Sequence, residues 1–588
     1  MKRLLPLLLL MCACSDQATG PDGSTYVHSM DGAPDSLDPA WASTIYANTV
    51  VVNLYDTLYR YQYLARPYAL APNLAAAMPE SSEDGLTVTI RIKPGVHFVD
   101  DPAFPGGAGR EVTAADVIYS IQRHFDPATR ARGAWLWRDR IVGLDEWKDA
   151  GADYDTDVAG LVALDSHTLQ VHLTRPYPQF VHTLAQGYAG VVPREAVEAY
   201  GRAFGAKAVG SGPFRLVSFD SARVVMDRNP GFRAETFDLA AEGYDAGTQS
   251  GLGLEPLQGR TLPLIDRLEV EFIAEDAARW NALRGGEIDY IKVPAAQFDQ
   301  VLATRKPLSL VPDLADEYAV AAAREAGFVY TNFDMSNPLI GHSDDPDRDE
   351  RNRALRCAII RGFDWEQRNE RFFSGIGAVF PGIIPPDVPE HDPAQDRTSV
   401  QRDVEGARAL LAENGWTAES LPTLTYGYPS SVTERQMFEQ FRAFMADIGY
   451  PHDRIKPLVY ARFGDYQRAY SEGEVMLITS GWTMDYPDSE NLVQLFYGPH
   501  AAPGANSASY SNPEYDALFE QAAPMPPSPA RTELYRRMNQ MVIDDCATIS
   551  GLSRTLVFMW QKDARMLPDR SFTGGYFLRF VDMASADE

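Results

Sequence analysis

The chain has 588 residues, 45% of them hydrophobic and 23% charged, which is typical of a folded soluble protein and argues against a disordered one. A single hydrophobic core does not extend over so long a chain, so we expect about three to four domains. The formal net charge of −28 argues against a nucleic-acid partner, because affinity for phosphates comes mainly from Lys and Arg.

The N-terminus has the features of an export signal. Two basic residues precede the apolar run Leu4–Leu10, which is too short for the roughly 20 residues that cross a bilayer. A small residue must precede the cleavage point, which favours cleavage between Ala13 and Cys14. We expect residues 1–13 to be removed and the polar residues 14–25 to form a flexible tether.

The end of this signal resembles a bacterial lipobox, although Met11 is a weaker choice than Leu at its first position. The resemblance implies that Cys14 is the lipidated N-terminus of the mature chain. The alternative is an ordinary signal peptide with two incidental cysteines. Ser15 stands where relatives retained at the inner membrane have aspartate, which slightly favours an anchor in the outer membrane.

Several elements are predicted in the first quarter of the chain. Apolar residues recur at helical spacing over 45–55, and apolar and polar residues alternate over 86–92 as in a half-buried strand. Thr113 and Asp116 have the spacing of a helix N-cap and an acidic group in the first turn. A second helix is therefore expected over 113–124.

Gly210, Ser211 and Gly212 form a tight connection into an expected strand over 214–219. Glycine lets a backbone approach a ligand or another segment closely, and the alternative is a plain tight turn. Neither Gly-Lys-Thr nor a helix follows, so the pattern excludes a nucleotide phosphate loop.

The rest of the chain combines irregular stretches with regular elements. Residues 240–263 and 382–398 are rich in Gly or Pro and predict surface loops or an insertion. Amphipathic helices are expected over 403–415 and 434–448, each ending at a glycine. An apolar strand is expected over 475–479.

Two cysteines lie far from the N-terminus, at Cys357 and Cys546. If Cys14 carries lipid, these two can pair in an oxidising compartment. Both have apolar neighbours in the sequence, so buried free thiols are the favoured expectation.

Ten further segments are informative because of their order along the chain. They are SLDPA at 36–40, LYDTLYRY at 54–61, APNLAAAMPESSEDGLTVTIRIKPGVHFVDDPAF at 71–104, EVTAADVIYSIQR at 111–123, VGSGPFRL at 209–216, LIDRLEVEFIAEDAARWNALRGGEIDY at 264–290, RNRALRCAIIRGFDWE at 351–366, DVEGARALLAENGW at 403–416, GWTMDYPDSENLVQLFYG at 481–498 and NSASYSNPEYDALFEQA at 506–522.

Together these segments resemble the bacterial extracellular solute-binding proteins of family 5, which serve dipeptide, oligopeptide and nickel importers. One segment alone would be weak evidence, but ten collinear matches cover nearly the whole mature chain. Two departures are a long turn before the capped helix and a Gly-rich stretch near residue 250.

The resemblance implies an α/β, two-lobed periplasmic-binding-protein fold of the large cluster C type, with an extra third domain. It implies a discontinuous first lobe over 26–75, 190–325 and 556–588. The extra domain is expected over 76–189 and the second lobe over 326–555.

The resemblance also identifies a candidate ligand contact at Asp485, which matches the carboxylate that holds the ligand's α-ammonium group in peptide-binding relatives. The segment 481–488 follows an apolar strand, and open α/β sheets bind ligands at strand ends. Trp482 and Tyr486 flank Asp485 and can exclude water or stack on a ligand, the alternative for each being core packing. Asp488 is expected to be a turn or cap residue.

Other candidate contacts follow from the expected arrangement of the lobes. Gly210–Gly212 would present backbone amides at the lobe junction, and Tyr46 would be a wall residue of the first lobe. The strand that contains Tyr330 and Asn332 would offer backbone edges to an extended peptide.

The sequence contains no recognisable catalytic constellation. It lacks the Gly-Xaa-Ser-Xaa-Gly, His-Glu-Xaa-Xaa-His, Cys-Xaa-Xaa-Cys and Walker patterns, so we expect neither an enzyme nor a cofactor. His342 and the four nearby aspartates can attract a divalent cation, but a hydrophilic loop without a metal site is the expectation.

The resemblance thus implies a substrate-binding lipoprotein of an ABC importer. It would be a periplasmic monomer, anchored to the membrane through lipid, that captures oligopeptides in an interlobe cleft and delivers them to the permease and ATPase subunits. One alternative is a non-peptide solute, such as an oligosaccharide, an opine, haem or a chelated metal, whose binding would not depend on a free amino terminus. Another is a periplasmic sensor or chaperone, against which neighbouring permease and ATPase genes would argue.

Overall fold

The computed structural model describes residues 24–472, 474–501, 504–568, 572 and 574–584. The export signal, its cleavage point, Cys14 and most of the expected tether lie outside the described residues. Among the helices that are described, none has both the length and the apolar character needed to cross a bilayer.

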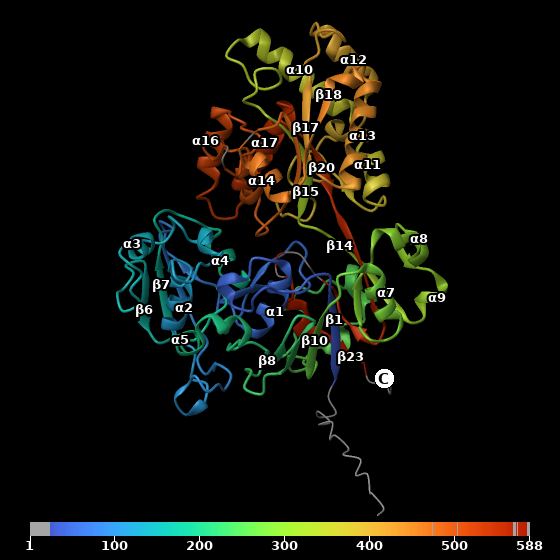
Figure 1. Ribbon diagram of the computed structural model, residues 1–588. Coiled ribbons are helices and arrows are strands. Elements are labelled where there is room, and N and C mark those ends of the chain that lie inside the picture. The colour runs from blue at the N-terminus through green and yellow to red at the C-terminus, as the bar shows by residue number, and fades with distance from the viewer. Residues whose placement is uncertain (1–23, 473, 502–503, 569–571, 573, 585–588) are drawn as a thin grey trace, which may run out of the picture.

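The molecule consists of a broad lower body and a smaller upper body joined by long strands (Figure 1). We keep the expected ranges as names for its parts: first lobe, extra domain and second lobe. The first lobe has a four-stranded sheet in the order β1-β10-β9-β8, in which only β1 and β10 are parallel. Its strands are β1 Thr25–Met30, β8 Phe214–Phe219, β9 Arg223–Arg228 and β10 Arg267–Phe272, and its helices include α1 Ile45–Leu54, α5 Arg194–Tyr200, α7 Asp276–Arg284, α8 Phe298–Val301 and α9 Pro312–Ala315.

The extra domain is built on an antiparallel sheet in the order β4-β5-β7-β6, and it lies beside the first lobe in the lower body (Figure 1). Helix α2 begins with the expected capping box, in which Thr113 and Asp116 satisfy each other's backbone amides. The elements are β4 Glu80–Ser81, β5 Thr87–Arg91, β6 Leu161–Asp165, β7 Thr168–His172, α2 Ala114–Gln122, α3 Leu144–Asp149 and α4 Phe180–Thr183.

The second lobe has a six-stranded sheet in the order β16-β20-β15-β19-β17-β18, with helices packed around it (Figure 1). The strands are β15 Gly327–Phe333, β16 Ala378–Val379, β17 Leu424–Pro429, β18 Ile455–Tyr460, β19 Leu477–Thr483 and β20 Thr548–Ser553. The helices are α10 Pro346–Gly362, α11 Trp365–Phe372, α12 Val404–Glu413, α13 Val432–Asp447, α14 Phe463–Ser471, α15 Glu490–Val493, α16 Pro513–Ala522 and α17 Pro529–Asp544.

Two antiparallel strands carry the chain between the lobes. Strand β14, Tyr318–Arg324, pairs along its whole length with β21, Thr555–Gln561, and β21 also pairs with β11, Tyr290–Lys292. In Figure 1, β14 runs from the lower body toward the upper one. Within the described part of the chain, these two strands carry the crossings between the lobes, and we call the pair the hinge.

Most locally predicted elements are confirmed within about two residues, including α1, β5, α2, β8, α12 and α13. The apolar strand expected over 475–479 is instead β19, which continues to Thr483. Strand β15 pairs with it from Phe333 opposite Leu477 to Gly327 opposite Thr483, and this partner extends the strand beyond its apolar core.

The Gly-rich stretch 240–263 is more ordered than the sequence predicts. It contains the short helix α6, Ala246–Gln249, and a buried residue, Glu242, attaches it to the lobe. Glu242 accepts hydrogen bonds from the Arg60 guanidinium at 2.8 and 2.5 Å and from the Tyr63 amide at 2.9 Å. The buried ion pair therefore makes this stretch an integral part of the first lobe.

Replacing Glu242 with glutamine should lower the free energy of unfolding of the first lobe by about 2–3 kcal/mol, because Arg60 would lose its bidentate partner while remaining buried. Chemical denaturation would measure the change. Glu255→Gln is the matched control, because Glu255 is exposed in the same stretch and should change stability by less than about 0.5 kcal/mol. Equal stability of the two variants would contradict an anchoring role for Glu242.

Cys357 and Cys546 form a disulfide, so the expectation of free thiols is wrong. Helix α10 and the turn after α17 bring their Cα atoms to 5.2 Å, within the range that a disulfide spans. The two residues are 189 positions apart, and only the packing of these helices shows that they meet.

Candidate ligand-binding site

A cavity of about 400 Å³ lies where the hinge meets the two lobes. This volume is within the range of small-molecule sites. Its walls include Ile45, Tyr46 and Lys292 of the first lobe, Arg324 and Phe558 of the hinge, and Thr483 of the second lobe. The cavity is therefore lined by both lobes and by the strands that join them.

The cavity wall carries charges of both signs. Lys292 Nζ lies 2.9 Å from an Asp31 carboxylate oxygen, and Arg554 Nε lies 2.5 Å from a Glu325 carboxylate oxygen. All four residues line the cavity. Polar walls with paired charges suit a polar or zwitterionic solute better than a purely apolar one.

Tyr46 lies on the cavity wall, where the sequence predicts a wall residue. Its ring packs so closely against Gly32 that a Cβ atom at Gly32 would lie 2.6 Å from Tyr46 Cε2. The glycine thus makes room for the ring beside the cavity.

Asp485 follows β19 and is held by Asn491. Asn491 Nδ2 donates to a carboxylate oxygen of Asp485 at 3.0 Å, and Asn491 Oδ1 accepts from the Asp485 amide at 3.1 Å and from Trp482 Nε1 at 2.9 Å. One asparagine therefore fixes both the carboxylate and the indole. Asn491 was not predicted as a site residue, although its position six residues after Asp485 in the same motif is a usable signal.

No described basic side chain forms an ion pair with Asp485. Burial raises the pKa of this carboxyl, and the hydrogen bond from Asn491 offsets part of the rise. A partly buried carboxylate without a cationic partner is a site where an ammonium group gains charge-assisted hydrogen bonds.

The surroundings of Asp485 come from all three parts of the molecule. Gln186 Nε2 of the extra domain donates to the Asp485 main-chain carbonyl. Burial raises the pKa values of Tyr61 of the first lobe and Tyr188 of the extra domain; the negative charges of Asp488 and Asp485 add to the rise at Tyr61, and that of Asp485 adds to the rise at Tyr188. Thr483, two residues before Asp485, lines the cavity, whereas Asp485, Trp482 and Tyr486 are not among its lining residues.

The two aromatic candidates beside Asp485 pack differently from each other. Trp482 is half-buried and packs against the hydrophobic core of the second lobe, and its indole Nε1 donates to Asn491 Oδ1. Tyr486 is only 2% exposed and donates to Glu490 at 2.6 Å. Both rings are engaged by protein groups, and Tyr486 belongs to a contact with the extra domain.

A buried ionic group lies behind the loop that carries Asp485. Arg531 in α17 pairs with Asp488 at 2.8 Å and with Glu390 at 3.2 Å, and all three side chains are at most 5% exposed. Ser489 Oγ donates to Glu390 at 2.9 Å. Asp488 also accepts from the Glu490 amide, as expected of a turn residue, so its carboxylate has two functions.

The Gly210–Gly212 connection packs against the end of α1. A Cβ atom at Gly210 would lie 2.1 Å from the Leu54 carbonyl oxygen, and the Gly212 amide donates to the same oxygen at 3.0 Å. Ser211 Oγ donates to Asp56 at 2.9 Å. The close approach that requires glycine here is thus made to a helix of the same lobe.

The expectation that the strand of Tyr330 and Asn332 offers free backbone edges is wrong. This strand, β15, pairs with β19 on one side and β20 on the other. Both edges are occupied, and Tyr330 and Asn332 are each 3% exposed. Strand order depends on tertiary contacts, which the sequence pattern does not reveal.

The aspartates near His342 serve α10. Asp345 is the N-cap, and Asp349 accepts from the Ser343 amide and lies 3.3 Å from His342 Nδ1. Within the described ranges, no group of three or more His, Cys, Asp and Glu side chains is arranged to hold a metal ion.

The chain is similar to known transport proteins over most of its length. The model of the bacterial extracellular solute-binding proteins, family 5 middle, matches residues 69–504. The dipeptide-binding protein of Escherichia coli K12 is 25% identical, covering 94% of this chain and 92% of that protein. The heme-binding protein A of Haemophilus influenzae is 23% identical, covering 90% and 86%. HbpA2 from Haemophilus parasuis superposes with a TM-score of 0.74 at 19% identity, covering 95% of this chain and all of that one.

Proposed function

The chain belongs to the bacterial extracellular solute-binding proteins of family 5, which serve ABC importers, and we propose that it captures short peptides between its lobes for delivery to a permease. The observation that carries this proposal is the cavity of about 400 Å³ lined by both lobes and the hinge. A solute held there contacts both lobes, so its binding energy favours the closed arrangement. Lipidation of Cys14, a periplasmic location and a monomeric state belong to the same proposal.

Asp485 is the proposed acceptor of the peptide's α-ammonium group. Support comes from its partial burial, its fixed orientation by Asn491 and its lack of an ion pair with any described side chain. The dipeptide-binding relative makes a peptide the first candidate, and the heme-binding relative makes a non-peptide solute the second.

Replacing Asp485 with asparagine should weaken peptide binding about 10- to 100-fold, because the charge-assisted hydrogen bond is worth about 1.5–3 kcal/mol. Native mass spectrometry of the full chain, purified gently in detergent, would detect peptide adducts that the variant no longer retains. Binding should also decline as pH falls through the raised pKa of Asp485, since only the ionised form attracts an ammonium group.

Asp396→Asn provides the control, because this exposed aspartate lies in the same lobe. Acetylating the amino terminus of the recovered peptides should weaken binding to about the same extent as the Asp485 substitution. Adducts of another chemistry, or peptides held equally well by Asp485→Asn, would refute the ammonium anchor and favour a non-peptide solute.

A further inference from the structure

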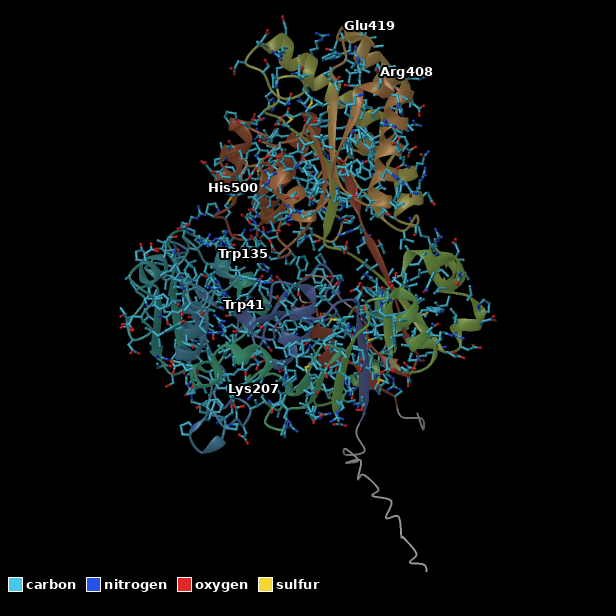
Figure 2. All side chains as sticks on the ribbon, in the orientation of Figure 1. Trp41, Trp135, Lys207, Arg408, Glu419 and His500 are labelled. Atoms are coloured by element: carbon cyan, nitrogen blue, oxygen red, sulfur yellow. A yellow bond between two sulfur atoms is a disulfide. The ribbon has the colours of Figure 1, made fainter. Side chains whose placement is uncertain are left out.

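The lobes are in contact on two sides of their junction. On one side are the hinge strands, together with the Arg324–Asp387 ion pair at 2.8 Å. On the other side, the segment around α4 of the extra domain meets the loop 485–490 of the second lobe. Figure 1 shows α4 and β14 well separated across the junction, and Figure 2 shows Trp135 of the extra domain and His500 of the second lobe at facing edges.

Three aromatic rings from three parts of the molecule stack at this second contact. His182 of α4 lies between Tyr61 of the first lobe and Tyr486 of the second, with ring centroids 5.8 Å from each. A hydrogen bond of 2.9 Å links the Tyr61 hydroxyl and His182 Nδ1. Burial lowers the pKa of His182 to about 4, so the ring is uncharged at neutral pH and packs as an apolar group.

A line of polar groups continues the contact. Arg140 of the extra domain donates to the Tyr177 hydroxyl, which lies 3.4 Å from the Tyr486 hydroxyl. Tyr486 in turn donates to Glu490, which is 7% exposed. Opening the lobes on this side would separate the Tyr177 and Tyr486 hydroxyls and the His182 and Tyr486 rings, while the Tyr486–Glu490 hydrogen bond stays within the second lobe.

Gln186 connects the same contact to the candidate binding site. Its side-chain amide donates to the main-chain carbonyl of Asp485, whose carboxylate is held by Asn491. The extra domain therefore touches the very residue proposed to receive the ligand. A shift of Gln186 would displace that residue's backbone.

We propose that the segment 177–186 of the extra domain is a latch that grips the loop 485–490, holds the lobes together opposite the hinge, and positions Asp485 for ligand. Gln186 is the residue that positions Asp485, and the stack of Tyr61, His182 and Tyr486 holds the two segments together. The role of Asp485 toward ligand rests on the function proposed above, whereas the latch itself does not depend on the identity of the solute.

A latch of this kind sets the fraction of molecules that are closed before ligand arrives. Because apparent affinity falls in proportion to that fraction, loosening the latch weakens every ligand by the same factor. Loss of Asp485 charge, in contrast, weakens only ligands with a free ammonium group. The two effects are therefore separable.

Gln186→Ala, tested in the full chain without added ligand, should make amide hydrogen exchange about 3- to 10-fold faster in both 177–190 and 484–491, because the two segments open together. Tyr177→Phe, which removes the hydroxyl contact and keeps the ring, should act on the same two segments. Exchange measured by mass spectrometry resolves them separately.

Gln170→Ala is the matched control, since this glutamine lies in β7 of the same domain and its side-chain amide donates to Thr89. It should leave exchange unchanged in both segments. Faster exchange in 177–190 alone, no change in either segment, or the same change in the control would each overturn the latch. Faster exchange in both segments would support the latch even if the peptide-binding experiments refute Asp485 as the ammonium acceptor.

Discussion

Replacing Arg531 with methionine should lower the free energy of unfolding of the second lobe by about 3–5 kcal/mol. The guanidinium is 2% exposed and neutralises two carboxylates, those of Asp488 and Glu390, which are themselves at most 5% exposed. Methionine fills much of the same volume but leaves two negative charges buried side by side. The cost of such uncompensated charge exceeds that of an ordinary core substitution.

The loss of unfolding free energy in this variant, relative to the native protein, should depend on pH. In the native protein, burial and the charge of Asp488 raise the pKa of Glu390. A carboxyl whose folded pKa is raised contributes stability below its unfolded pKa and loses it as pH rises through the folded pKa. Without Arg531 the raised pKa shifts further upward, so the deficit should be largest near pH 7 and should shrink toward pH 4.

Thermal and chemical denaturation at several pH values would measure the effect. Arg537→Met in the same helix is the matched control, because Arg537 is exposed and its pair with Glu514 lies on the surface. That variant should change stability by less than about 1 kcal/mol. A deficit independent of pH would mean that lost packing, not uncompensated charge, causes the effect.

Features that depend on neighbours in the sequence were predicted correctly. Thr113 and Asp116 define the start of α2 because capping depends on neighbours within four residues. The boundaries of β8 follow from the local pattern as well. The position of Asp485 at the end of a strand also follows, because an apolar run and the motif after it are adjacent in sequence.

Long-range partners are what the sequence did not reveal. Glu390 and Arg531 are 141 positions apart, and nothing local distinguishes them from surface charges. The central place of β15 depends on two strands that lie far from it in sequence. Gln186 is 299 positions from Asp485, so its contact becomes visible only when the extra domain and the second lobe are packed together.

Breaking the disulfide should have an effect of similar size in the same lobe. The bond joins residues 189 positions apart, and closing so long a loop removes much of the unfolded chain's freedom. The chain-entropy model gives about 5 kcal/mol for a loop of this length, and native disulfides typically contribute about 2–5 kcal/mol. Cys357→Ala should therefore lower the unfolding transition of the second lobe strongly and that of the first lobe little.

Because either substitution breaks the bond, the double variant Cys357→Ala/Cys546→Ala should lose little more than Cys357→Ala alone. Adding reductant should lower the transition of the native protein in calorimetry and leave the variants unchanged. Peptide mapping without reduction should recover Cys357 and Cys546 in one cross-linked pair. If native protein and variant unfold together in the absence of reductant, the bond does not stabilise the lobe, and the packing of α10 against the turn after α17 is sufficient by itself.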